Sequence, residues 1–221
     1  MAVLRSLESM LFGRTKSQMV EPETALKGHP DYTFSVPKTH YVNGHPITPP
    51  FPDGMATAVF GSGCFWGVEE IFWQVPGVYS TAVGYAGGYS PYPTYEEVCT
   101  GRTGHTEAVL VVYDPVVVSY AELVATFFET HDPTQGMRQG NDVGTQYRSA
   151  IYYGSDEERD VAEQAAKAYS VPLEARGYGP VTTEIAPLRH FYYAEDYHQQ
   201  YLAKNPYGYR CHESTGIPFP R

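Results

Sequence analysis

A run of five aliphatic residues near the middle of the chain limits the folds that are open to it. The run covers residues 108–112, Ala-Val-Leu-Val-Val, and lies between Glu107 and Tyr113. A short run that is apolar at every position predicts a strand buried inside a sheet, and the Asp114-Pro115 pair that follows ends it. The remaining elements therefore have to form layers around a central strand.

Apolar patterns elsewhere in the chain predict further strands and helices around this central strand. Helical spacing of apolar residues and Ser-x-x-Glu capping signals predict helices, and short apolar runs between turn residues predict strands. The expected order is strand 56–60, helix 65–75, strand 79–85, strand 107–113, helix 119–130, strand 149–153, helix 155–169, strand 181–185 and helix 194–203. This order predicts a mixed sheet with helices packed on it, and its long loops, residues 87–105 and 133–147, are expected to frame the functional site.

The beginning of the chain differs in composition from the rest. Residues 1–54 are rich in proline and polar side chains and show no sustained apolar period. We expect this segment to be an extended N-terminal arm, which is either disordered or wraps the body. Residues 55–221 are expected to form a single catalytic domain that includes a mobile C-terminal tail.

Charge and cysteine content argue against several classes of protein. A net charge of −10 speaks against nucleic-acid binding. The 3 cysteines can form no closed disulfide framework and match no metal-ligand spacing, so neither a structural zinc site nor an oxidising compartment is expected. Arg5 and Glu8 interrupt the apolar residues of the N-terminus, so no secretory segment or membrane span is expected. We therefore expect a cytoplasmic monomer without nucleic-acid or membrane partners, with an organelle-targeting segment as the alternative.

The pentapeptide Gly-Cys-Phe-Trp-Gly at residues 63–67 places Cys64 between a predicted strand and a predicted helix. Backbone N–H groups at a helix N-terminus stabilise a thiolate, which makes a cysteine there more nucleophilic. Phe65 and Trp66 add two large apolar surfaces beside the sulfur. The pentapeptide alone is equally compatible with a small buried structural thiol, so other residues have to decide.

Four further features could supply partners for Cys64, and each has a structural alternative. Glu107 lies where a glycine-rich loop meets the central strand, so desolvation should raise the pKa of its carboxyl group, unless it is a strand-edge glutamate paired with water or an arginine. Residues 139–148 concentrate polar side chains, which indicates oriented hydrogen bonding or a polar turn. Cys211, in a tail rich in glycine and proline, could reach the first thiol or could be an exposed cysteine without a role. Cys99 has neither context, which favours a packing role.

Eight motifs, in this order, resemble those of the A-type peptide methionine sulfoxide reductases. They are Gly-Cys-Phe-Trp-Gly at 63–67, Gly-Tyr-Ala-Gly-Gly at 84–88, Pro-Thr-Tyr-Glu-Glu-Val at 93–98, Gly-His-Thr-Glu-Ala at 104–108, Gln-Gly-Asn-Asp at 139–142, Gly-Thr-Gln-Tyr-Arg-Ser at 144–149, Phe-Tyr-Tyr-Ala-Glu-Asp-Tyr-His-Gln-Gln-Tyr-Leu at 191–202 and Lys-Asn-Pro-Tyr-Gly-Tyr at 204–209. The resemblance covers nearly all of residues 57–212, and the arm is similar to that of longer bacterial members. It implies an α+β fold: a two-layer α/β sandwich with a mixed sheet and a ferredoxin-like core, with long irregular loops and tails.

The resemblance also implies an activity, the reduction of the S epimer of methionine sulfoxide, free or in oxidised proteins, which repairs oxidative damage. Cys64 would attack the sulfoxide sulfur as a thiolate while a neutral Glu107 protonates the departing oxygen. The other implied site residues are Phe65 and Trp66 around the substrate methyl group, Tyr95 and Tyr147 around the oxygen, and Asp142 behind them, holding a water or polar groups.

Regeneration of the enzyme is implied by the resemblance as well. Cys64 would become a sulfenic acid, Cys211 would convert it to a Cys64–Cys211 disulfide, and a thioredoxin-like external reductant would reduce that disulfide. No bound metal, flavin or nicotinamide is implied. Some members carry two cysteines in this tail, whereas this chain has Cys211 alone and resembles the branch with a single tail cysteine.

Two other readings of the residues compete with this one. Cys64 could serve a cysteine hydrolase or another thiol transferase, with His198 or His212 as the base, although that assignment leaves Glu107 and Cys211 without a role. The many tyrosines could instead belong to a non-catalytic binder of oxidised or aromatic ligands.

Overall fold

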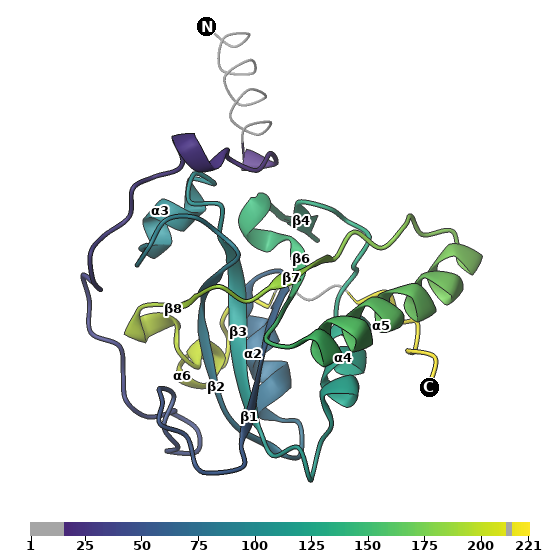
Figure 1. The fold of residues 1–221 in the computed structure, drawn as a ribbon, viewed down its shortest axis with the longest axis horizontal. Coiled ribbons are helices and arrows are strands. Elements are labelled where there is room, and N and C mark those ends of the chain that lie inside the picture. The colour runs from purple at the N-terminus through teal and green to yellow at the C-terminus, as the bar shows by residue number, and fades with distance from the viewer. Residues whose placement is uncertain (1–15, 211–213) are drawn as a thin grey trace, which may run out of the picture.

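The aliphatic run forms the middle of β3 (Thr106–Tyr113), a central strand of a six-stranded sheet in which every β3 residue is buried (Figure 1). The computed structural model describes residues 16–210 and 214–221. The strand order is β7-β6-β1-β3-β2-β8, made by β1 (Ala56–Ser62), β2 (Val78–Ala86), β6 (Ser149–Tyr153), β7 (Glu184–Pro187) and β8 (Phe191–Tyr193). The β6–β7 pair is parallel and the other pairs are antiparallel, so the predicted mixed sheet is confirmed.

Three helices cover one face of the sheet and enclose the main hydrophobic core. They are α2 (Phe65–Trp73), α4 (Tyr120–Glu129) and α5 (Asp156–Ala175). Phe60 of β1, for example, stacks against Phe72 of α2 and Phe127 of α4. The predicted capping serines are also confirmed, since Ser119 and Ser155 each accept a hydrogen bond from a backbone N–H in the first turn.

The N-terminal arm covers the opposite face of the sheet. Its described part, residues 16–54, runs along the outside of the molecule (Figure 1). Ile47 is completely buried in a second apolar cluster with Val59, Leu110 and Tyr152, whose side chains point away from the helices. A short 3₁₀ segment, η1 (Pro22–Thr24), lies near the start of the arm. Of the two alternatives for the arm, its described part therefore wraps the body.

The two long loops contain short helices and strands in addition to the elements expected above. Residues 87–105 contain α3 (Tyr95–Cys99), whose N-cap Thr94 and Glu97 form a capping box, a signal that is visible in the sequence. Residues 133–147 contain the small hairpin β4 (Arg138–Gln139) and β5 (Asp142–Val143), followed by η2 (Thr145–Tyr147).

Two of the predicted helices differ from the structure. The helix expected over residues 155–169 continues through Pro172 to Ala175 as α5. The helix expected over residues 194–203 is wrong, because the segment forms η3 (Asp196–His198) and a separate α6 (Tyr201–Lys204). Gln200, between them, has a left-handed φ of 47°, which cannot continue a right-handed helix. The neighbouring Gln199 uses its side chain to hydrogen-bond the backbone of β2 at Val83.

The tail returns to the helical layer after α6. Ile217 is buried, and its carbonyl oxygen accepts a hydrogen bond of 2.7 Å from the hydroxyl of Tyr169 on α5. Cys211 and His212 lie outside the described residues.

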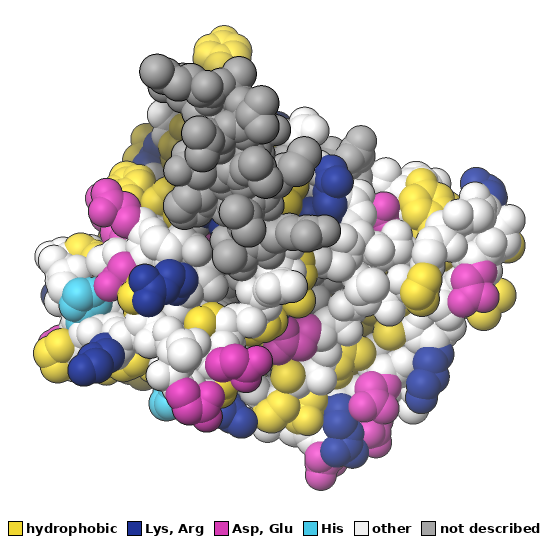
Figure 2. Space-filling model, turned by 90° about the horizontal axis from the view of Figure 1, so that it is seen from above, with side chains coloured by type: hydrophobic (Ala, Val, Ile, Leu, Met, Phe, Trp, Pro, Cys, Tyr) yellow, Lys and Arg dark blue, Asp and Glu magenta, His cyan; other side chains and the backbone are white. Residues whose placement is uncertain are grey.

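Surface charge and helix composition are the features that would indicate a nucleic-acid or membrane partner. On the face shown in Figure 2, basic and acidic side chains are interspersed, and the described residues in view form no continuous basic surface. Within the described residues, no helix is both long enough and apolar enough to span a bilayer.

Candidate active site

Cys64 is the N-cap residue of α2 and is separated from the end of β1 by Gly63 alone, at the strand-to-helix junction that the sequence indicated. Its side chain is only 7% exposed. The turn depends on Gly63, which has a φ of 94°, and a Cβ there would come within 2.8 Å of the Gln139 side chain. A helix N-terminus carries partial positive charge, so the turn sets the Cys64 sulfur where a thiolate is stabilised.

Glu107, the second residue of β3, is brought to the same helix N-terminus. Its carboxyl oxygen Oε2 accepts a hydrogen bond of 3.0 Å from the backbone N–H of Phe65, the residue next to Cys64. Burial raises the pKa of Glu107 to about 8, and the charge of Asp142 adds to this, while the Phe65 hydrogen bond acts in the opposite direction. At neutral pH the carboxyl group is therefore mainly protonated and can donate its proton.

A small cavity joins these groups. It measures about 130 Å³ and is lined by Cys64, Phe65, Trp66, Tyr95, Glu107, Asp142, Tyr147 and Tyr209. Seven of these eight are residues that the sequence singled out, brought together from four separate segments of the chain. Such a volume holds a group of a few non-hydrogen atoms, which is the size of a methyl sulfoxide head.

Tyr209 also lines the cavity, although it was not among the expected site residues. Its signal was the motif at residues 204–209, which ends in this tyrosine. Cys211, two residues further, lies outside the described residues.

Two tyrosine hydroxyls reach the cavity from different elements. Tyr95 is the first residue of α3, and its backbone N–H donates to Glu195 at 2.8 Å. Tyr147 is the last residue of η2. Burial, followed by the negative charge of Glu107, raises the pKa of both phenols well above their usual range. Both hydroxyls therefore keep their hydrogens and can donate to an oxygen in the cavity.

Trp66 is held as one wall of the cavity by two aromatic neighbours. Its indole Nε1 donates to Nδ1 of His198 at 2.9 Å. Its ring stacks on Tyr201 with centroids 3.9 Å apart and an interplanar angle of 15°. Burial lowers the pKa of His198 to about 4, so this ring is neutral and its Nδ1 is already occupied as an acceptor. These features argue against His198 as the base of a cysteine hydrolase.

Asp142 contributes an oxygen to the cavity from β5. Its Oδ2 atom is buried and has no hydrogen-bond partner among the described residues. A buried carboxylate oxygen normally accepts a hydrogen bond, so this atom is suited to receive one from a molecule bound in the cavity.

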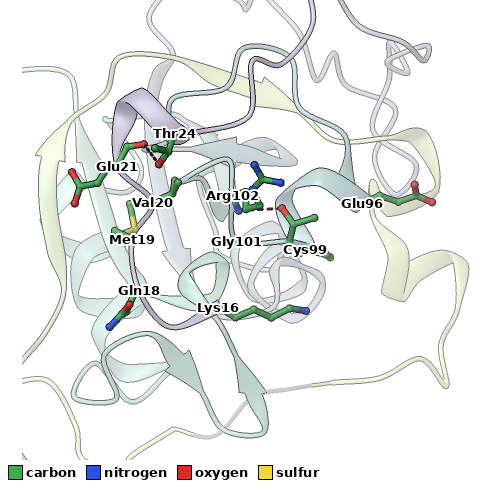
Figure 3. Close-up of a pocket in the computed structure, with 11 residues that line it drawn as sticks. Lys16, Gln18, Met19, Val20, Glu21, Thr24, Glu96, Cys99, Gly101 and Arg102 are labelled. Carbon is green, nitrogen blue, oxygen red and sulfur yellow. Dashed lines mark hydrogen bonds between the residues drawn. The ribbon is translucent and has the colours of Figure 1, made fainter. Parts of the chain in front are cut away.

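Cys99 faces a different space at the end of α3. It lines a larger pocket of about 890 Å³ between α3 and the arm, together with Lys16, Met19, Val20 and others (Figure 3). A side-chain hydrogen bond joins the thiol to Tyr95, and burial raises the pKa of the thiol, which makes it a poorer nucleophile. In the described part of the chain, no group of three or more His, Cys, Asp or Glu side chains could hold a metal ion.

Comparison with known proteins gives consistent matches. A family model described as peptide methionine sulfoxide reductase matches residues 56–217. The peptide methionine sulfoxide reductase MsrA of Rhodospirillum centenum is 62% identical over 210 residues, which cover 95% of each chain. MsrA of Azorhizobium caulinodans is 58% identical over 211 residues, which cover 96% of each chain.

Solved structures agree with these matches. Methionine sulfoxide reductase A of Corynebacterium diphtheriae has a TM-score of 0.83 and 50% identity, covering 92% of this chain and 100% of that chain. Mxr1 of Saccharomyces cerevisiae in its reduced form has a TM-score of 0.68 and 36% identity, covering 73% of this chain and 91% of that chain. Mxr1 has also been solved in complex with Trx2, a structure that is similar in fold at 22% identity and a TM-score of 0.51. The likeness to these structures confirms the predicted α+β fold.

Proposed function

Because the chain belongs to the peptide methionine sulfoxide reductase family, we propose a role for each cavity residue in that reaction. The protein is an oxidoreductase that reduces methionine sulfoxide to methionine. The observation that carries the assignment of roles is the meeting of Cys64 with a protonated Glu107 in one small cavity.

The substrate sulfoxide is placed by complementary surfaces. Its methyl group lies against the apolar rings of Phe65 and Trp66, and its oxygen lies toward Glu107 and the hydroxyls of Tyr95 and Tyr147. Asp142 holds polar groups or a water behind the oxygen. An apolar wall and a donor cluster on different sides of one sulfur atom distinguish two epimers, which supports selectivity for one of them. The resemblance of the motifs to the A-type family assigns the S epimer.

The chemistry uses two groups at the N-terminus of α2. The Cys64 thiolate attacks the electrophilic sulfur while the Glu107 carboxyl group protonates the oxygen, so the S–O bond can break. The helix N-terminus stabilises the thiolate, and the two tyrosine hydroxyls stabilise charge that develops on the oxygen. The oxygen leaves as hydroxide and then attacks the Cys64 sulfur, which breaks the new bond between that sulfur and the substrate sulfur. The thioether of methionine is released, and Cys64 is left oxidised to a sulfenic acid.

Regeneration needs a second thiol and an external reductant. Cys211 attacks the Cys64 sulfenic acid, releases water and forms a disulfide, which a thioredoxin-like protein reduces by thiol exchange. The complex of the yeast relative Mxr1 with Trx2 supports a reductant of this class. The substrates are oxidised proteins or free methionine sulfoxide, and the chemistry requires no prosthetic group.

We further propose the organisation and location of the protein. Residues 1–54 serve as an arm on a catalytic domain formed by residues 55–221, in a cytoplasmic monomer. The scarcity of cysteines supports a reducing compartment.

One experiment tests the mechanism directly. Enzyme without reductant is mixed with each epimer of a blocked methionine sulfoxide, and methionine and remaining thiols are counted after a single turnover. We expect one methionine per enzyme from the S epimer, with the loss of two thiols, at positions 64 and 211. Equal turnover of the R epimer would contradict the assigned roles. Thiols that are still free at both positions 64 and 211 after turnover would also contradict them.

A further inference from the structure

Glu69 is a buried carboxyl group that the mechanism above does not use. It lies on α2 one turn after Phe65 and is completely buried. Its Oε2 accepts the backbone N–H of Gln200 at 2.7 Å. Its Oε1 accepts the side-chain Nε2 of Gln200 at 2.6 Å and the hydroxyl of Thr81 at 3.0 Å. Three donors therefore converge on this one carboxyl group.

The direction of the hydrogen bonds continues into the N-terminal arm. Nδ1 of His40 accepts the backbone N–H of Val42 at 3.2 Å, which leaves the ring hydrogen on Nε2. That Nε2 lies 3.0 Å from the Thr81 hydroxyl and donates to it, so the hydroxyl donates onward to Glu69. Each hydrogen bond from His40 through Thr81 donates in the direction of Glu69, an arrangement that an acceptor-only carboxylate completes. A buried network with every member partnered specifies one local arrangement.

Gln200 is the residue on which this network acts. It adopts a left-handed conformation with a φ of 47°, which a residue with a side chain keeps only when its surroundings hold it. Glu69 binds both its backbone N–H and its side-chain amide, and the arm adds a third contact of 2.9 Å from the N–H of Tyr41 to its Oε1. Gln200 thus joins α2, the sheet and the arm.

The neighbours of Gln200 in sequence hold Trp66. His198, on one side, accepts the indole N–H of Trp66, and Tyr201, on the other side, stacks on its ring. A change in the backbone at Gln200 would move these two residues relative to each other. The orientation of the Trp66 wall therefore depends on a conformation that Glu69 secures.

We propose that Glu69 is a positioning residue of the substrate site, which acts through Gln200 to fix Trp66 and links that wall to the N-terminal arm. The inference rests on the proposed role of Trp66 as a wall of the substrate cavity. Glu69 lines no part of that cavity, so its effect on substrate binding is indirect.

The test is a double-mutant cycle on the full-length chain. The variants are Glu69→Gln, Trp66→Phe and the double variant, assayed by single turnover without reductant over a range of blocked methionine (S)-sulfoxide concentrations. Glu69→Gln keeps the size of the side chain but presents an amide donor to the donors of Gln200. We expect it to raise the half-saturating concentration about fivefold, with a change of less than about twofold in the maximal rate. In the Trp66→Phe background the same change should raise the half-saturating concentration by less than about twofold, because phenylalanine lacks the indole N–H that His198 holds.

A matched control separates positioning from loss of stability. Val124→Ala removes buried atoms from α4, which contributes no residue to the cavity, and should lower the unfolding temperature without changing the half-saturating concentration. Gln200→Met is the second variant if Glu69→Gln fails to fold. It loses the side-chain contacts but keeps the backbone N–H bond, and it should show the same dependence on Trp66.

The outcomes distinguish this inference from the proposed function. The positioning role alone would be overturned if Glu69→Gln changed the half-saturating concentration equally in the wild-type chain and in the Trp66→Phe background. It would also be overturned if Val124→Ala raised that concentration as much as Glu69→Gln does. An unchanged half-saturating concentration in Trp66→Phe would overturn the role of Trp66 as a wall and this inference with it.

Discussion

The carboxyl group of Glu107 accepts a hydrogen bond of 3.0 Å from the backbone N–H of Phe65. The two residues are 42 positions apart in sequence and meet because β3 lies beside the turn from which α2 begins. This contact holds the acid next to Cys64, while burial and the charge of Asp142 keep the acid protonated by raising its pKa to about 8. One contact therefore sets the relative position of the nucleophile and the proton donor.

Replacement of Glu107 by Gln should slow the chemical step. The amide keeps the size of the side chain but cannot supply a proton, so we expect the single-turnover rate to fall about 100-fold or more, with a much smaller change in half-saturating substrate concentration. Rapid quenching of enzyme mixed with methionine (S)-sulfoxide measures both quantities. A variant with the wild-type rate would remove Glu107 from the role of acid.

The single-turnover rate should fall as the pH rises through about 8. Below its raised pKa Glu107 carries the proton that the oxygen needs, and above it that proton is lost. Rates at limiting substrate between pH 6 and pH 10, an interval chosen to bracket that pKa by about two units on each side, test this dependence. The same alkaline fall in Glu107→Gln would show that another group causes it.

The stability of the folded chain should also decrease as the pH rises from about 4.5 to about 8. Burial raises the pKa of Glu107 to about 8, from about 4.5 for a glutamate in the unfolded chain. Over this window the folded state binds more protons than the unfolded state, so the free energy of unfolding falls with rising pH. Urea unfolding at both ends of the window measures the fall, which should be smaller in Glu107→Gln. An equal fall in that variant would mean that Glu107 does not contribute.

Replacement of Cys211 by Ser should leave the first turnover intact and block regeneration. The Cys64 sulfenic acid then has no tail thiol to condense with, so one methionine forms per enzyme and the reaction stops. Mass spectrometry after a sulfenic-acid trapping reagent identifies the modified cysteine. If the variant still cycles with a thioredoxin-like donor, the double variant Cys99→Ser/Cys211→Ser shows whether Cys99 replaces the missing thiol.

Replacement of Gly63 by Ala should destabilise the fold by about 2 kcal/mol. Its φ of 94° strains any residue with a side chain, and the new Cβ would also contact Gln139 at 2.8 Å. Gly177 is a matched control, with a φ of 84° but nothing within 4 Å of an added Cβ, so Gly177→Ala should cost only about 1 kcal/mol. Urea unfolding measures both losses, and equal losses would show that the contact with Gln139 has no cost.

Local patterns predicted much of the fold and the list of candidate residues. The aliphatic run at residues 108–112 was sufficient for β3, and Ser119 and Ser155 marked the starts of two helices. The helix predicted over residues 194–203 did not form, because tertiary contacts outweighed the local pattern. Apolar spacing indicated a helix there, but Gln199 and Gln200 bind distant groups on β2 and α2, and those contacts prevail over local helical preference.

Local signals, namely glycines, an apolar run and helical spacing, are enough to place Cys64 at a strand-to-helix turn. The groups that surround Cys64 are set by the packing of distant segments. Glu107 became a protonated neighbour of Cys64 and Gln200 became the junction between the arm and the Trp66 wall. Burial, pKa and side-chain contacts all depend on how distant segments pack, and the physical forces that set them act only after the sheet, the helices and the arm have come together.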